Sequence, residues 1–531
     1  MKKNHLLDLV PLFLYFLLSI TLLAQALNYT GGQIGYPVDD AFIHMAIARH
    51  FAQDGRWSVD LSPFTSASSS PLWTLLVGVT FRLVGVRDWA AVLLSLLAGA
   101  AALLTAQQLL AHSSRQLVRV VLVILVLIFT PLPVLGLTGM EHALHALITA
   151  LVLWSAAEWL GTRERSSRPG WGLLALCAVL PVTRYEGLFL LVWIGLALLW
   201  QKRLRAALAL GAASASLMTF YGIISLRNGW AFFPNSVLVK GTASLSSTAG
   251  LAQFLTQGIF NLLDTPALFG LIVAILLAFA VGESLGLLNP AQRWRVGLFA
   301  GMFGLHLQLA KTGWFFRYEA YLIFTGSLLL MELLAVLLRW LQSRPQVRFS
   351  PLSVAVIAMT LLLLLPLAYR GGNALAAYPL AVRNIHEQQV QMARFVHRFH
   401  NGQTVVANDI GAISYYNDIH LIDVVGLANR QTARWWQDGT WSPEKVDRLA
   451  RAEGAALAIL YPEWFELYPK PNNWVETGRW RIADNIVCTS DTVGFYALGA
   501  DRADEIAQHL RAFSSELPPT VQWQVLAPQN P

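Results

Sequence analysis

Charged residues are scarce in this sequence of 531 residues. Asp, Glu, Lys and Arg together account for 13% of the chain, whereas an average soluble domain carries about 25%. At the same time, 55% of the residues are hydrophobic. A deficit of charge over so long a chain argues against a soluble protein and predicts a polytopic membrane protein.

Cysteine is nearly absent as well. Cys177 lies in an apolar run and Cys488 lies in the C-terminal region, so no disulfide framework is expected. The formal net charge is +7, which on its own would suit a nucleic-acid-binding protein. However, the Lys and Arg residues stand between long apolar runs, as they do in cytoplasmic loops that face anionic lipids. We therefore expect membrane lipids, and no nucleic acid, as partners.

Apolar runs recur along the first 370 residues. A helix that crosses a bilayer needs about 20 apolar residues. The first run follows Lys2-Lys3 and is interpreted as an uncleaved membrane helix rather than a signal peptide. The segment 71–86 is short and contains Arg82, so we expect a juxtamembrane or re-entrant helix there, with a short true span as the alternative. About eleven runs remain as predicted transmembrane helices: 8–27, 89–111, 117–137, 142–160, 171–183, 187–200, 206–226, 258–282, 296–310, 318–340 and 352–369.

The loops between these runs show a regular charge pattern. With the N-terminus inside, every inside loop is basic, as the positive-inside rule requires. We therefore expect a multi-pass protein of the cell (inner) membrane, with a cytoplasmic N-terminus and an extracytoplasmic C-terminal domain. The basic residues of the inside loops are Arg115, Arg119, Arg163, Arg165, Arg168, Lys202, Arg203, Arg205, Arg293, Arg295, Arg339, Arg344 and Arg348.

The predicted fold class is an all-α polytopic membrane domain, residues 1–370, followed by a small α/β soluble domain, residues 371–531. Charged and polar residues return after about Gly371, and helical and strand-like patterns alternate there. The serine-rich stretch Ser62–Ser70 is expected to be a mobile loop. The elements predicted in the soluble domain are helices over 382–400 and 443–453, the second capped by Ser442, and strands over 404–407, 421–425 and 455–461.

Two adjacent carboxylates, Asp39 and Asp40, open a helix expected over 40–53 in the first outer loop. Capping that helix is the ordinary role for such an Asp, because the side chain and the helix dipole interact favourably. The alternative is a general base with a second carboxylate that positions the donor or a metal. Asp40 and His44 share one helical face at i, i+4 spacing, which suits a metal pair, although His44 could equally be an interface residue.

Later outer loops carry further acidic and basic residues. Glu141 stands at the edge of a span, where a carboxylate is costly unless it is used or solvated. Arg184 and Glu186 could bind a ligand or simply pair with each other.

The remaining outer loops carry isolated cations. Lys240 could snorkel to the membrane surface. Lys311 and Arg317 could meet a phosphate, or they could anchor the membrane surface together with neighbouring aromatic residues. What favours a site is that the acids come early, the cations come late, and all of them fall on one side of the predicted topology.

At these residues the sequence resembles the GT-C superfamily, polytopic transferases that use polyprenyl-phosphate sugars. The resemblance covers most of the chain and is closest in character to bacterial terminal arabinofuranosyltransferases and their uncharacterised relatives. The segments that carry it are Asp39–His44, Ser69–Thr74, Gly139–Glu141, Arg184–Gly187, Pro234–Ser236 with Lys240, Arg317-Tyr318, Asn408–Ile413 and Asp423–Leu427.

The resemblance implies transfer of a sugar from a polyprenyl-phosphate donor to an extracytoplasmic glycan, lipid or protein acceptor, with inversion. It leaves a divalent metal, Mg²⁺ or Mn²⁺, open because members of the superfamily differ in this respect, and Asp40 and His44 are the candidate ligands. The residues that we expect in the site are Asp39 and Asp40 for catalysis, with Asp39 as the base; Arg184, Lys240, Lys311 and Arg317 for the donor phosphate; and His44, Glu141 and Glu186 as supporting residues.

Two other classes of protein share this composition. A transporter usually shows repeated halves with broken helices at matching positions, and no such pairing is found. In a receptor-like membrane protein, the outer domain alone would bind the ligand. Four tryptophans of that domain are expected to be core or docking residues, with sugar stacking as the alternative: Trp435, Trp436, Trp441 and Trp464.

Overall fold

The computed structural model describes residues 5–111, 115–162, 169–240, 248–344 and 351–526. The chain divides into two compact units, and each is assembled from segments that are far apart in the sequence. The first unit comprises Met1–Leu22, Val92–Phe220 and Gly241–Ala376. The second unit comprises Leu23–Ala91, Tyr221–Lys240 and Ala377–Pro531.

The first unit is built of helices, four of which (α2, α5, α11 and α17) also contribute residues to the second unit. Its elements are α1 (His5–Asp8), α2 (Val10–Tyr29), α5 (Trp89–Leu110), α6 (Gln116–Phe129), α7 (Leu132–Leu137), α8 (His142–Gly161), α9 (Trp171–Thr183), η1 (Tyr185–Gly187), α10 (Leu188–Trp200), α11 (Leu204–Arg227), α13 (Thr248–Asp264), α14 (Pro266–Ser284), α15 (Pro290–Leu309), α16 (Ala320–Gln342) and α17 (Pro351–Ile385).

Six helices within the described residues are long and apolar enough to cross a membrane. These six helices are Leu6–Tyr29, Trp89–Leu110, His142–Gly161, Leu204–Arg227, Pro266–Ser284 and Ala320–Gln342. The count of about eleven transmembrane helices stays a prediction.

Prolines divide two of the predicted apolar runs. The run 258–282 is interrupted between Asp264 and Pro266, where α13 ends and α14 begins. Proline suits the first turn of a helix because its missing N–H would have had no partner there. The run 117–137 is likewise divided near Pro131 into α6 and α7. One continuous helix over either run was therefore a wrong prediction, whereas α9 and α10 are separate helices, as expected.

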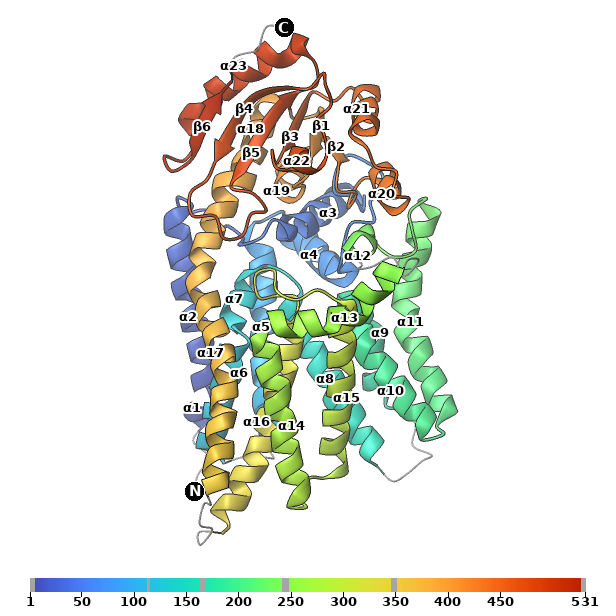
Figure 1. The fold of residues 1–531 in the computed structure, drawn as a ribbon, viewed down its shortest axis with the longest axis vertical. Coiled ribbons are helices and arrows are strands. Elements are labelled where there is room, and N and C mark those ends of the chain that lie inside the picture. Colours follow the sequence, from blue (N-terminus) through green and yellow to red (C-terminus); the bar gives the residue numbers. More distant parts are fainter. Residues whose placement is uncertain (1–4, 112–114, 163–168, 241–247, 345–350, 527–531) are drawn as a thin grey trace. The chain divides into compact units, whose positions relative to one another are not determined.

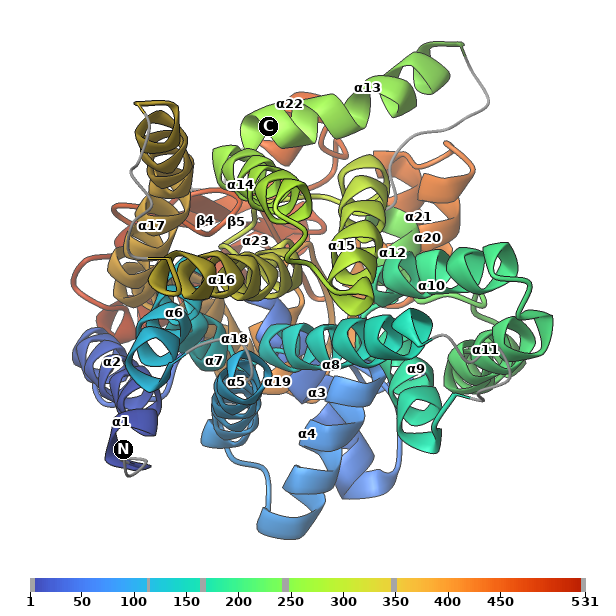
Figure 2. The ribbon, with the colours of Figure 1, turned by 90° about the horizontal axis from the view of Figure 1, so that it is seen from below.

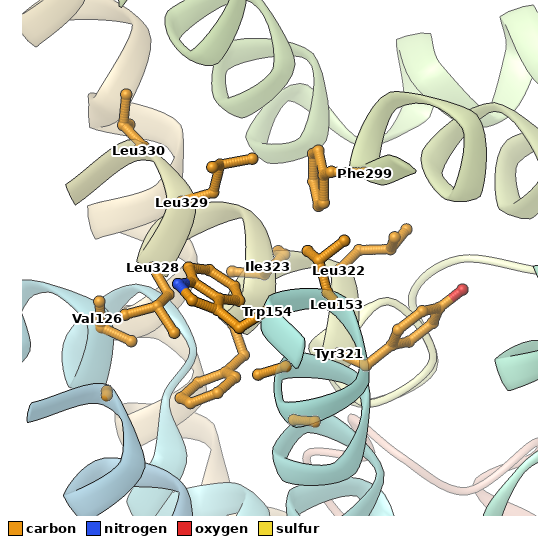
Figure 3. Close-up of a cluster of buried hydrophobic side chains, with 14 of the residues drawn as sticks. Val126, Leu153, Trp154, Phe299, Tyr321, Leu322, Ile323, Leu328, Leu329 and Leu330 are labelled. Atoms are coloured by element: carbon orange, nitrogen blue, oxygen red, sulfur yellow. The ribbon is translucent and has the colours of Figure 1, made fainter. Parts of the chain in front are cut away.

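The core of the first unit lies between α8, α15 and α16, which pack against one another (Figures 1 and 2). Figure 3 shows Leu153 and Trp154 of α8, Phe299 of α15 and several residues of α16 gathered in this cluster. Apolar residues cover α16 on nearly all sides, and most of its side chains are buried. A helix that is apolar all round is suited to such an enclosed position.

The second unit contains a mixed sheet of six strands in the order β2-β1-β3-β5-β4-β6, which Figure 1 shows from right to left. Strand β1 is parallel to β2 and β3, and the remaining neighbours are antiparallel. The strands are β1 (Thr404–Ala407), β2 (His420–Asp423), β3 (Leu457–Leu460), β4 (Val475–Arg481), β5 (Thr492–Ala497) and β6 (Gln522–Val525). The helical elements of this unit are α3 (Asp40–Asp54), α4 (Pro71–Val84), α12 (Asn235–Lys240), η2 (His386–Val390), α18 (Gln391–Phe399), α19 (Gly411–Tyr415), α20 (Arg430–Gln437), α21 (Pro443–Ala452), α22 (Trp464–Leu467), η3 (Ala500–Arg502), α23 (Ala503–Phe513) and η4 (Ser514–Glu516).

The α/β pattern predicted for the C-terminal region is confirmed by these elements. Strands β1, β2 and β3 lie within or within one residue of the predicted segments. Ser442 caps α21, since its hydroxyl accepts the backbone N–H of Lys445 at 3.3 Å. All four residues of β1 and of β3 are buried, as expected for strands in the middle of a sheet.

The division at residues 370 and 371 stays a prediction. Helix α17 runs without a break from Pro351 to Ile385, through that position. The second unit also takes in the segment 23–91, which contacts the C-terminal part of the chain directly. For example, Arg49 of α3 pairs with Asp418 at 2.9 Å.

The stretch Ser62–Ser70 is not the mobile loop that its composition suggested. Ser66 and Ser68 are buried. The Ser66 hydroxyl accepts a hydrogen bond from Ser225 at 2.9 Å, and the Ser66 carbonyl accepts the N–H of Asn235 at 2.9 Å. The expectation of mobility was wrong because these hydroxyls find partners from a distant part of the chain.

The tryptophans of the second unit pack mainly on one another and on the core. The rings of Trp436 and Trp441 are stacked with centroids 4.9 Å apart, and Trp464 meets both rings edge-on. Trp435, Trp441 and Trp464 pack against the buried cluster that includes Ile422. This arrangement favours the core role over sugar stacking.

Candidate functional site

The Asp39 carboxylate turns away from the helix that it precedes. Asp39 stands at the N-cap of α3, and its side chain makes no capping hydrogen bond. Instead, Oδ2 accepts the backbone N–H of Gly411 at 2.7 Å, and Oδ1 accepts that of Ala412 at 2.8 Å. The capping role weighed from the sequence does not apply, and the carboxylate is held by the first residues of α19, 372 residues further along the chain.

Gly411 is needed for this approach. A Cβ atom at this position would lie 2.2 Å from the carbonyl oxygen of Asp39 and 2.6 Å from its Oδ2. Real Cβ atoms essentially never come so close to an oxygen, and here one of the oxygens belongs to the backbone. The glycine in Asn408-Asp409-Ile410-Gly411 therefore lets the two backbones meet.

Asp409 brings another carboxylate to the same place. Its Oδ2 accepts a hydrogen bond from Gln389 Nε2 at 2.7 Å and another from the Tyr461 hydroxyl. Gln389 also donates to the Tyr461 oxygen at 3.1 Å. Gln389 lies on η2 and Tyr461 directly follows β3, so two elements of the sheet domain fix the orientation of Asp409.

The surroundings of Asp39 and Asp409 favour the protonated form of both carboxyl groups. Burial raises the pKa of Asp39 well above its usual range, and the nearby charges of Asp409 and Asp40 raise it further. The two backbone N–H bonds oppose this shift because they stabilise the anion. Burial also raises the pKa of Asp409, against the hydrogen bonds from Tyr461 and Gln389. A carboxylate of raised pKa takes a proton more readily, as a general base must.

His44 is directed into a cluster of hydroxyls. Its Nδ1 lies 2.8 Å from Thr74 Oγ1 and 3.4 Å from Ser68 Oγ, and the ring is buried between α3 and α4. Among the residues that the structure describes, no group of three or more His, Cys, Asp or Glu side chains is arranged to hold a metal ion. The metal site expected at Asp40 and His44 stays a prediction.

A charged cluster in the first unit joins three of the predicted residues. Arg184 Nη1 lies 2.6 Å from Glu141 Oε1, and Arg184 Nη2 lies 2.6 Å from Glu186 Oε1. Glu141 is fully buried at the start of α8, and Arg184 stands between α9 and η1. Arg184 thus pairs with both carboxylates in a network of ion pairs, and its contact with the donor phosphate stays a prediction.

Arg317 lies close to this cluster. Its side chain is 1% exposed, its guanidinium lies 5.2 Å from the Tyr318 ring centroid, and its Nη1 lies 2.8 Å from Met140 Sδ. Arg184 approaches the same Tyr318 ring at 5.9 Å. The preceding residues Trp314–Phe316 have left-handed backbone angles, with φ between 42° and 61°, a conformation that is costly for bulky residues. Strain of this kind gathers at functional loops.

Two charged residues beside this loop escaped the sequence analysis. Glu319 Oε1 accepts from Arg370 Nη2 at 2.6 Å, and Glu319 Oε2 accepts the N–H of Gly313 at 2.8 Å. Both side chains of this ion pair are buried. The signal that could have revealed them was an ionisable residue at the start of the apolar run 318–340 and another at the end of the apolar run 352–369.

The last two predicted cations are less well defined. Lys311 is exposed, just beyond the end of α15. Lys240 is the final residue of α12, and its side chain lies outside the described residues.

Comparisons with known proteins bear on the fold. A family model described as a domain of unknown function (DUF8728) matches residues 383–496, and no curated protein matches the chain. The solved structure of ArnT from Cupriavidus metallidurans in the apo state is similar, with 16% identity, a TM-score of 0.51 and coverage of 92% of this chain and 98% of that one. The same protein bound to undecaprenyl phosphate gives 15% identity, a TM-score of 0.51 and the same coverage.

A third similar structure is the oligosaccharyltransferase of Archaeoglobus fulgidus in the apo form. It has 12% identity, a TM-score of 0.50 and coverage of 92% of this chain and 75% of that one. ArnT is thus known in complex with undecaprenyl phosphate, a polyprenyl phosphate, and the third protein is an oligosaccharyltransferase. The fold resemblance predicted from the sequence is thereby confirmed.

Proposed function

We propose that the protein is a membrane glycosyltransferase that moves a sugar from a polyprenyl-phosphate donor to an extracytoplasmic glycan, lipid or protein acceptor, with inversion. The observation that carries the proposal is the Asp39 carboxylate, which is held by two backbone N–H groups beside a second half-buried carboxylate, Asp409. The shared GT-C fold supports it, as does the undecaprenyl phosphate bound to one of the similar proteins.

The proposed step is a single displacement. Asp39 takes the proton of an acceptor hydroxyl while that oxygen forms a bond to the anomeric carbon. The bond from this carbon to the phosphate oxygen breaks, and its electron pair stays with the phosphate. Attack from the face opposite the phosphate inverts the anomeric configuration. Because the leaving group is already an anionic phosphate, its departure needs charge stabilisation more than it needs an acid.

Cations of the predicted site supply that stabilisation in the proposal. Arg317 is the strongest of them, since it is buried beside a strained aromatic loop and shares the Tyr318 ring with Arg184. Arg184 itself is assigned to positioning, because Glu141 and Glu186 offset its charge. Lys311 and Lys240 remain proposed phosphate contacts. No step is assigned to a metal, and the role of Asp40 and His44 as metal ligands stays a prediction.

The testing experiment uses the full chain in lipid nanodiscs and a panel of polyprenyl-phosphate sugars. The readouts are release of polyprenyl phosphate and transfer of labelled sugar to envelope extracts. Asp39→Asn should remove turnover, and Arg317→Gln should weaken it about tenfold to a hundredfold, the value of one charge-assisted hydrogen bond. Lys202→Gln, which removes an exposed cation from the turn between α10 and α11, should leave turnover unchanged. Binding or transport of the donor without sugar transfer would favour the transporter or receptor class instead.

A further inference from the structure

A cavity with charged residues in its lining lies within the first unit, at residues to which the proposed reaction assigns no role. Its volume is about 560 Å³, which is within the range of small-molecule sites. It is formed where α5, α8 and α16 approach their C-terminal ends and α15 begins. The residues on which the inference depends are Gln108, Trp154, Glu158, Arg295, Glu332 and Arg339.

An arginine between two carboxylates forms the inner wall of this cavity. Arg295 donates through Nη2 to Glu158 Oε1 and through Nη1 to Glu332 Oε1. Its guanidinium also lies 5.4 Å from the Trp154 ring centroid. The Arg295 and Glu332 side chains are each 5% exposed, although α16 is one of the candidate membrane spans. Ionisable groups inside a membrane helix are costly and mark functional sites by default.

Ion pairing does not satisfy every polar atom of this wall. Within the described part of the chain, Arg295 Nε and Glu332 Oε2 are buried and have no hydrogen-bond partner. One is a donor and the other is an acceptor. Buried polar atoms are nearly always paired in folded proteins, so a ligand that offers both an acceptor and a donor would complete the cluster.

The charges around the cavity cancel. Glu158 and Glu332 supply two negative charges, and Arg295 and Arg339 supply two positive charges, with no other charged residue in the lining. Glu158 and Arg339 lie at the opening of the cavity, because the Glu158 side chain is 64% exposed and Arg339 is exposed as well. A neutral site with separated charges suits a zwitterion better than an anion.

We propose that this cavity binds the headgroup of a zwitterionic phospholipid that carries an ammonium and a phosphate. The ammonium lies against Glu332 and Glu158, and the phosphate lies against Arg339 and the Nε edge of Arg295. Apolar side chains in the same lining, among them Leu109 and Val336, contact the glycerol and the start of the acyl chains. The basic loops place these helix ends on the cytoplasmic side, so the lipid comes from the cytoplasmic leaflet.

A purely structural role, in which Arg295 only holds α8, α15 and α16 together, would account for its ion pairs. It would not account for the open cavity of about 560 Å³ beside them. The two explanations differ at Glu158 and Arg339, because these exposed residues can change without burying an uncompensated charge.

The test measures lipid binding to the full chain by native mass spectrometry, with phosphatidylethanolamine, phosphatidylglycerol and soluble phosphoethanolamine as probes. The parent protein should retain phosphatidylethanolamine in preference to phosphatidylglycerol. Arg339→Gln should weaken this binding about tenfold to a hundredfold, the range for one charge-assisted hydrogen bond. Glu158→Gln should reverse the preference, because the site then carries a net positive charge.

Arg344→Gln is the matched control, since it removes an exposed arginine that follows the same helix but lies outside the cavity lining. It should leave the lipid preference unchanged. Equal retention of both lipids by the parent, or an unchanged preference in Glu158→Gln, would overturn the proposal. Binding of soluble phosphoethanolamine as tight as that of the lipid would reassign the cavity to a water-soluble zwitterion.

Discussion

Replacement of Asp39 by Asn is expected to abolish sugar transfer and to leave the protein folded. An amide cannot take the proton of an acceptor hydroxyl. General-base catalysis contributes about 10²–10⁴-fold to a rate, so kcat/KM should fall by at least about a hundredfold. The pH dependence of the parent protein should agree, because the base must be deprotonated to act. Since burial raises the Asp39 pKa, activity should rise with pH through a limb that lies above the usual Asp value of about 4.

The same replacement should lower stability by a calculable amount. The two carboxylate oxygens of Asp39 accept one backbone N–H each, from Gly411 and Ala412. In Asn, an NH₂ donor takes the place of one oxygen, so one of these N–H groups loses its acceptor. A buried donor without a partner costs about 1–3 kcal/mol. Asp39→Asn should therefore melt at a lower temperature than the parent protein.

The loss of catalytic rate in Asp39→Asn can be distinguished from its loss of stability. Folded domains are stable by about 5–15 kcal/mol, so even the largest cost leaves about 2 kcal/mol at the lower end of that range. At 2 kcal/mol only about 3% of the molecules are unfolded. A hundredfold loss of turnover in Asp39→Asn would therefore reflect the chemistry rather than the fold.

Asn417→Ala provides a control with a similar loss of stability. Asn417 Nδ2 donates to the carbonyls of Ala393 at 3.0 Å and Ile413 at 2.9 Å, and so it fixes the end of α19, the segment that holds Asp39. This variant removes buried hydrogen bonds from the same segment and keeps the carboxylate. Donor turnover and thermal unfolding would be measured for both variants in nanodiscs. If Asp39→Asn kept more than a tenth of the parental kcat/KM, or if Asn417→Ala lost as much activity, the assignment of the base would be refuted.

Three further predictions concern the neighbours of Asp39 and the topology. Asp409→Asn removes a negative charge that raises the Asp39 pKa, so the acidic limb of the pH–rate profile should move to lower pH; an unmoved limb would show that the carboxylates do not interact. Gly411→Ala places a Cβ 2.2 Å from the Asp39 carbonyl oxygen, and turnover should fall at least about tenfold while the lipid preference of the cavity beside Arg295 is kept. In a chain without Cys177 and Cys488, a membrane-impermeant thiol reagent applied from outside should label Asn472→Cys and not Arg344→Cys, and the reverse pattern would invert the predicted topology.

Local signals in the sequence located the elements of the fold well. The cap at Ser442 and the apolar strands are short-range features, and their physical causes act within a few residues. Two breaks at prolines were overlooked, although Pro131 and Pro266 were visible in the sequence. The buried loop around Ser66 could not be inferred from composition, because its hydroxyl is satisfied by Ser225, which is 159 residues away.

In the candidate site too, local features could be predicted from the sequence and long-range contacts could not. Asp39 stood out from its position and from the resemblance, but its partners did not. Gly411 lies 372 residues further on, and no periodic pattern pairs an acidic residue with a backbone N–H at that distance. Asp409 was visible only as one residue of the segment Asn408–Ile413, which contributes to the resemblance. Its role depends on Gln389 and Tyr461, which the fold of the sheet domain brings to it.

The hydrogen bonds of the two carboxylates show why Asp39, and not Asp409, is suited to act as the base. An ionised carboxylate offers about four lone-pair positions. Asp39 uses two of them on the backbone N–H groups of Gly411 and Ala412, one on each oxygen, so each oxygen keeps a position for the proton of a substrate. Asp409 directs one oxygen to both Tyr461 and Gln389, which fixes it as a charged neighbour. Backbone donors cannot rotate away or titrate, so the orientation of Asp39 persists whether or not it carries the proton.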